Sequence, residues 1–214
     1  MKRTLLTLMC LAPLAPMALA EIIDFEDVNL GAATRDNFLN LGIENTYRGY
    51  TWSRGPSNFG GEGYWAAVAN GDGQFVGAHG GNQSGWNWNG PRTLSVTFDV
   101  DKIYVGAWFN VFSGGQDWGA DAVNVIGYDS SNSVTGQTGF VALDDVSASP
   151  GWVYAAGGFT ARRIEILVRQ DDTSWGPDGW WSVDDIELGV VPEPCTMIAL
   201  GAGLVGFVAR RRRK

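Results

Sequence analysis

Tryptophans beside amide side chains are the residues of this 214-residue chain best suited to bind a ligand. Trp86 and Trp88 stand two positions apart in the stretch 82–90, which is otherwise rich in Asn, Gln, Ser and Gly. In an extended chain, residues at i and i+2 lie on one side, and side-chain amides both donate and accept hydrogen bonds. Indole faces pack against the apolar C–H faces of sugar rings, so this stretch is typical of sugar binding. The alternative is that such loop tryptophans fold back over the core.

Two further stretches combine acids and indoles in the same way. Trp118 lies within 116–121, and Trp175 lies within 171–180. We therefore expect a sugar-binding surface built from loops, with four stacking residues: Trp86, Trp88, Trp118 and Trp175. Three other tryptophans fall in strand-like patterns and are predicted to lie in the core: Trp52, Trp108 and Trp181.

Sites for catalysis are harder to find. His79 is the only histidine, and the chain has neither a Gly-x-Ser-x-Gly elbow nor a His-Glu-x-x-His pattern. We interpret His79 as a solvated loop residue. Two carboxylates at the right separation can hydrolyse a glycoside, but a sequence does not give that separation. We therefore predict that the protein is not an enzyme, with a glycan hydrolase or lyase as the less favoured alternative.

Adjacent acids, Asp184 and Asp185, stand in the last predicted strand. Neighbouring residues of a strand point to opposite faces, so one of the two carboxylates turns toward the edge of the sheet. A buried carboxylate without a partner would be costly. Carboxylate oxygens suit calcium, whereas zinc prefers thiols and imidazoles. The chain has one histidine, and its two cysteines, Cys10 and Cys195, lie near the ends.

The elements that must position these side chains are predicted to be strands. Apolar and polar residues alternate at 94–100 and again at 163–169. Pairs of glycines interrupt the chain as turns. Further strands are expected at residues 22–26, 49–53, 103–109, 122–128, 138–143 and 180–188. Many short strands joined by Gly-, Asn- and Ser-rich loops indicate an all-β protein, an antiparallel β-sandwich with Greek-key or jelly-roll-like wiring.

Residues 1–20 are typical of a secretory signal peptide, with two cations followed by a leucine-rich run. The small residues Ala18 and Ala20 predict cleavage before Glu21. The remaining body, residues 21–190, has the size of one domain. It contains 22 carboxylates and eight cations, a net charge of −14. Such a surface disfavours nucleic acid as a partner and is compatible with neutral glycans or divalent cations.

Residues 191–214 are predicted to be a second targeting segment. An apolar run at 195–209 is followed by five cations at 210–214. As a helix, the run reaches about 22 Å, which is short of the roughly 30 Å hydrocarbon core, so we predict one short transmembrane helix. The cations should stay on the cytoplasmic side, which places the body across the inner membrane. A permanent membrane anchor is the alternative.

The residues before this helix add information. Prolines hold the tripeptide from Pro192 to Pro194 stiff and extended, which makes it a poor helix but a good peptidase substrate. Followed by an apolar run and an arginine cluster, it resembles the PEP-CTERM sorting signal of exopolysaccharide-producing bacteria with two membranes. The resemblance implies that an exosortase cuts here and delivers the protein to the cell envelope or the exterior. The residues expected at this processing site are Val191, Pro192, Glu193 and Pro194.

Short motifs spread through the body carry a second resemblance, at residues 23–27, 47–52, 105–110, 123–128 and 181–188. They resemble exported bacterial jelly-roll domains, which are similar to carbohydrate-binding modules. The resemblance implies that the first and last strands lie side by side with a structural calcium between them. Its ligands would be Glu26 and Asp184 or Asp185, with Asp24 and Asp27 in reserve.

Taken together, these features predict an exported, non-enzymatic envelope or extracellular-matrix protein that binds or organises exopolysaccharide. The expected partners are an exosortase, a polysaccharide and, transiently, the inner membrane. Structural Ca²⁺ is the one expected cofactor. The main alternative is a surface protein that acts through protein contacts.

Overall fold

The computed structural model describes eight ranges of the chain: 21–27, 44–55, 64–69, 78–88, 93–111, 119–143, 151–169 and 181–190. These ranges contain strands that pair antiparallel with their neighbours. The strands are β1 (Glu21–Ile23), β2 (Glu44–Tyr47), β3 (Tyr50–Arg54), β4 (Tyr64–Ala69), β5 (Gln83–Trp88), β6 (Thr93–Val111), β7 (Ala122–Tyr128), β8 (Val134–Gln137), β9 (Val141–Ala142), β10 (Val153–Arg169) and β11 (Trp181–Val190). The prediction of an all-β, antiparallel protein is confirmed there, whereas sandwich and jelly-roll wiring stays a prediction.

The predicted targeting segments lie outside the described residues. This applies to the signal peptide at 1–20, with Ala18 and Ala20, and to the tail at 191–214. Within the described ranges, no helix has the length and hydropathy that a membrane span requires.

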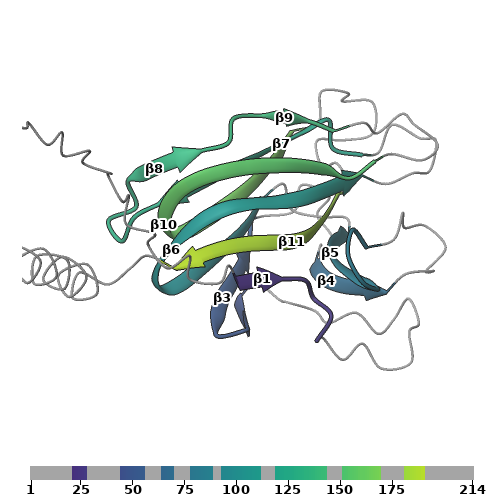
Figure 1. Cartoon of the computed structure of the whole chain (residues 1–214), viewed down its shortest axis with the longest axis horizontal. Coiled ribbons are helices and arrows are strands. Elements are labelled where there is room, and N and C mark those ends of the chain that lie inside the picture. Colours follow the sequence, from purple (N-terminus) through teal and green to yellow (C-terminus); the bar gives the residue numbers. More distant parts are fainter. Residues whose placement is uncertain are drawn as a thin grey trace, which may run out of the picture.

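The two long strands β6 and β10 form the centre of the sheet (Figure 1). The strand order is β4-β5-β11-β6-β10-β7-β8, and β1 adds to β11 while the β2–β3 hairpin adds to β6. One edge of β6 therefore has two partners, β3 along residues 94–97 and β11 along 102–111. Between these halves the pairing with β10 shifts register, and residues 99–101 are exposed. Such irregularities bend a strand, which lets one long strand serve two parts of the fold.

Alternate residues of the strands fill a common core. In the second half of β6, Ala107, Phe109 and Val111 are buried, as the period of two requires. The largest fully buried side chains include Trp52, Trp86, Trp181, Tyr104, Phe25 and Phe109. The prediction that Trp52 and Trp181 lie in the core is confirmed, whereas Trp108 is only partly buried.

The observed strands differ from the predicted ones mainly in segments whose sequence is polar. The predicted strand at 122–128 is β7, and the runs at 94–100 and 103–109 belong to the single strand β6. The prediction at 138–143 is wrong in detail, because β8 ends at Gln137 and β9 covers only two residues. The periodicity does not predict β2, β4 or β5. The sequences ENTY and QSGWNW lack apolar alternation, so the partner strands rather than a buried stripe define β2 and β5.

The first and last strands are neighbours, as the family resemblance implied. Glu21 pairs with Leu188, and Ile23 pairs with Ile186. The Glu21 carboxylate also accepts a hydrogen bond from the Tyr50 hydroxyl and lies 3.0 Å from Lys102 Nζ. The start of the body is thus held beside the end of β11.

Candidate functional site

A row of neighbouring side chains crosses three strands at one end of the central sheet. Trp108 on β6 is paired with Asp184 on β11 and with Tyr154 on β10. Residues paired in this way lie on the same face of a sheet. The Tyr154 hydroxyl donates to Glu187 Oε2 at 3.2 Å. A Cβ at Gly106 would lie 2.2 Å from the Tyr154 ring, so glycine is what lets this tyrosine lie across β6.

His79 lies over this row. Its ring stacks on Trp108 with centroids 3.9 Å apart, and Trp152 approaches it edge-on at 5.8 Å. Nδ1 of His79 lies 2.7 Å from Oδ2 of Asp185. His79 is an exposed loop residue, as the sequence indicated. Its side chain, however, is 29% exposed and contacts three other side chains, which the sequence did not indicate.

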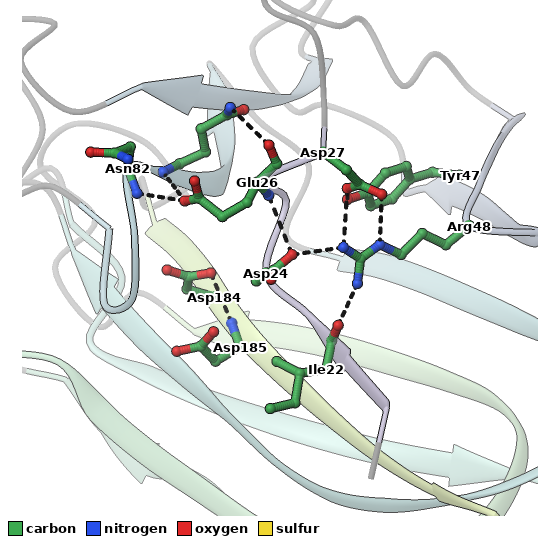
Figure 2. A network of polar contacts seen from close by, with 10 residues as sticks. Ile22, Asp24, Glu26, Asp27, Tyr47, Arg48, Asn82, Asp184 and Asp185 are labelled. Atoms are coloured by element: carbon green, nitrogen blue, oxygen red, sulfur yellow. Dashed lines mark hydrogen bonds and ion pairs between the residues drawn. The ribbon is translucent and has the colours of Figure 1, made fainter. Parts of the chain in front are cut away.

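Two acids hold the loop that carries His79: Asp184 on β11 and Glu26 in the turn that follows β1. Oδ2 of Asp184 accepts the backbone N–H groups of His79 at 2.9 Å and Gly80 at 3.3 Å. Glu26 Oε1 accepts the backbone N–H groups of Asn82 and Gln83 (Figure 2). Carboxylates that accept backbone N–H groups fix a loop without apolar packing. Segments far apart in the sequence thereby come together at His79.

The Asp184 carboxyl has an unusual environment. Its side chain has no exposed surface, and this burial raises its pKa to about 7. The N–H groups of Asp185, Gly80 and His79 oppose the shift, while the negative charge of Asp185 adds to it. Asp185 itself has a φ of 46°, and the pairing of β11 with β6 shifts register between Asp184 and Glu187. This irregularity explains how two adjacent acids both serve the same loop.

The two reserve acids of the sequence analysis contact Arg48 rather than the His79 loop, and Asp24 also accepts the backbone N–H of Glu26 at 3.3 Å (Figure 2). Arg48 Nη2 lies 2.7 Å from Asp24 Oδ1, and Arg48 Nε donates to Asp27 Oδ2 at 3.1 Å. The Tyr47 hydroxyl also donates to Asp27. The hydrogen bond from Arg48 has the larger effect and the one from Tyr47 the smaller, and both hold the pKa of Asp27 below its usual value. Asp24 and Asp27 thus tie β1 to the hairpin of β2 and β3.

The acids expected to hold calcium do not gather into a metal-binding group. Within the described ranges, no three His, Cys, Asp or Glu side chains are arranged to hold a metal ion. Asp184 and Glu26 instead accept backbone N–H groups, and Asp185 faces His79. Calcium at Glu26, Asp184 and Asp185 therefore stays a prediction, and no step below depends on a metal.

Of the four tryptophans predicted to stack on sugars, the structure describes the side chain of Trp86 alone. Trp86 is only 1% exposed, because residues 83–88 form strand β5 between β4 and β11 rather than a loop. This burial corrects the expectation that its ring faces a ligand. Trp88 is the last residue of β5, but its side chain lies outside the described residues, as do Trp118 and Trp175.

The sequence analysis did not assign Trp108, Trp152 or Tyr154 to a binding surface, and it placed Trp108 in the core. All three are partly exposed and lie around His79 or one another, with Trp108 and Tyr154 centroids 5.0 Å apart. One signal was available for Trp108. The apolar positions Ala107, Phe109 and Val111 alternate, and alternation places Trp108 on the opposite face.

Comparison with known proteins identifies the C-terminal segment. Residues 190–213 match the family model of the PEP-CTERM protein-sorting motif. The tail is a sorting signal. A PEP-CTERM motif implies export, anchoring in the membrane and processing by an exosortase, as the order of features around Pro192–Pro194 predicted. The match covers the tail and says nothing about the activity of the body.

The body itself has weaker likenesses. No curated protein matches the chain. Among solved structures, the chain is similar to the CBM22-1 xylan-binding domain of Paenibacillus barcinonensis Xyn10C. The identity is 16%, the TM-score is 0.33, and the match covers 65% of this chain and 85% of that domain. A likeness at this score carries no argument about fold or ligand.

Proposed function

We propose that this exosortase-sorted protein binds polysaccharide at the cell envelope or in the extracellular matrix, through the aromatic surface around His79. This surface consists of His79, Trp108, Trp152 and Tyr154, with Asp185 and Glu187 at its edge. The observation that carries the proposal is the contact of four partly exposed rings, with His79 stacked on Trp108 at 3.9 Å.

The chemistry of this surface matches that of a sugar. The apolar C–H face of a sugar ring packs on indole and imidazole rings, and the hydroxyl rim requires hydrogen-bond acceptors and donors. Asp185 and Glu187 provide acceptors beside the rings. Because two carboxylates fix the loop that carries His79, the surface is arranged before a ligand arrives, which lowers the entropic cost of binding.

A hydrolase or lyase is the second candidate, and one contact favours it. Nδ1 of His79 lies 2.7 Å from Asp185, a pairing that can orient a histidine as a general base. The same binding assay distinguishes the two functions. New reducing ends or unsaturated sugars released from the polysaccharide would support an enzyme, whereas retention without products supports binding alone.

The experiment compares Trp152→Ala with Phe140→Ala by affinity electrophoresis in polysaccharide from a producing bacterium. The chain is used without its signal peptide, in mild detergent. We expect Trp152→Ala to lose retention, because it removes the edge-on ring beside His79. Phe140→Ala removes an exposed ring that packs against Arg169 elsewhere, and it should be retained like the parent protein.

Equal retention of the two variants would show that the aromatic surface is not the binding site. If the parent protein is not retained and its tryptophan fluorescence does not change, polysaccharide binding itself is refuted. A surface protein acting through protein contacts would then be the better reading.

A further inference from the structure

Among the residues that the structure describes, two carboxylates contact the aromatic surface. Glu187 accepts the Tyr154 hydroxyl, and Asp185 lies 2.7 Å from His79 Nδ1. The cations whose side chains the structure describes have partners elsewhere: Arg48 with Asp24 and Asp27, Lys102 with Glu21, Arg162 with Asp101, Arg163 with Glu165, and Arg169 over Phe140. The surface therefore combines aromatic faces with a negative rim.

This combination discriminates between charged sugars. The faces of indole rings carry partial negative charge and attract ammonium groups. Carboxylates attract the same groups and repel uronic acids, and the net charge of −14 on the body acts in the same direction. A neutral sugar gains the stacking contacts alone.

The geometry points to a polysaccharide with free amino groups, such as a deacetylated hexosamine polymer, as the ligand of the aromatic surface. This inference rests on the proposed function and specifies its substrate class. The hexosamine ring packs on the aromatic residues, and its ammonium group is attracted to Glu187, the carboxylate that the Tyr154 hydroxyl already holds in place.

Three hexasaccharides test the inference by calorimetry with the chain lacking its signal peptide, in mild detergent. Glucosamine and N-acetylglucosamine hexamers share one backbone and differ only in whether the amine is free, and a uronic acid hexamer carries the opposite charge. At about pH 6 and low salt, we expect the free-amine hexamer to bind about tenfold more tightly than the acetylated one, with the uronic acid weakest. Added salt should reduce this preference, because it screens exposed charges.

Two variants separate local recognition from bulk charge. Glu187→Gln keeps an acceptor for Tyr154 but removes the charge, and it should reduce the preference for the free amine severalfold. Asp101→Asn removes one carboxylate from the exposed bend at 99–101 and should leave the preference unchanged. Melting curves confirm that both variants fold.

Each outcome has a distinct meaning. If the acetylated hexamer binds as tightly as the free amine, the amino-sugar inference fails while the proposed function survives. If Glu187→Gln and Asp101→Asn lose the preference equally, the attraction is that of an acidic protein in general, and the inference is again refuted. If none of the hexamers binds, the amino-sugar inference is refuted, and the proposed function fails as well only if the parent protein is also not retained by polysaccharide in affinity electrophoresis.

Discussion

The raised pKa of Asp184 should make the stability of the folded protein depend on pH near neutrality. Its pKa is about 7 in the folded state because the side chain is buried, against 3.8 for an exposed aspartate. Between these values the folded chain holds a proton that the unfolded chain has lost. The contribution of Asp184 to stability is therefore fully present below pH 3.8 and is lost as the pH rises through 7.

The substitution Asp184→Asn removes this titration while keeping the size of the side chain. Other acids, such as Asp27 with its lowered pKa, change stability in the opposite direction, so the useful quantity is the difference between parent and variant. From pH 5 to pH 8, the unfolding free energy of the parent should fall relative to that of the variant by about 2–3 kcal/mol. A constant offset from the altered hydrogen bonds does not affect this slope.

Urea unfolding followed by tryptophan fluorescence measures the difference at each pH, in the presence of EDTA. Asp101→Asn serves as the control, and because this carboxylate is exposed, its difference should vary by less than about 0.5 kcal/mol. A flat profile for Asp184→Asn would refute the reasoning. It would mean that the three N–H donors outweigh burial and keep Asp184 ionised throughout this range.

Three further predictions concern metal, packing and maturation. If Glu26, Asp184 and Asp185 hold a calcium ion, EDTA should lower the melting temperature by several degrees. An unchanged melting temperature would refute the calcium prediction. Gly85→Ala should destabilise the fold by about 1–3 kcal/mol in urea, because the new Cβ would lie 2.8 Å from the Phe25 ring, whereas Gly151→Ala meets nothing within 4 Å and should have little effect. Mass spectrometry of the protein from its host should show a C-terminus within 191–194, as exosortase processing implies, and intact tails in most copies would contradict it.

The strands were predictable where a buried stripe repeats every second residue. Leu94, Val96 and Phe98 alternate with polar residues, and the structure buries all three. The same logic failed for β5, whose polar sequence is extended because β4 and β11 supply its hydrogen-bond partners. Trp86 was consequently expected on a loop surface, whereas its strand places it in the core.

The candidate site was also only partly predictable from the sequence. The sequence analysis selected Asp184, Asp185 and Glu26 as calcium ligands. In the structure, Asp184 and Glu26 accept backbone N–H groups of the loop that carries His79, and Asp185 lies beside the His79 ring. The sequence analysis did not select His79, because the acids that bind it stand more than a hundred residues away in the chain. No local pattern reports a contact of that kind.

The sequence by itself determined that the chain ends in a sorting signal and that the body is all-β and acidic. A sorting signal, an alternation of apolar and polar residues, and a net charge each depend on the order or the number of residues along the chain, so they are visible without a structure. Only the tertiary structure decided which aromatic residues reach the surface and which acids border them. That choice depends on strand register and on the irregularity at Asp184 and Asp185, where a shift of one residue moves a side chain to the opposite face.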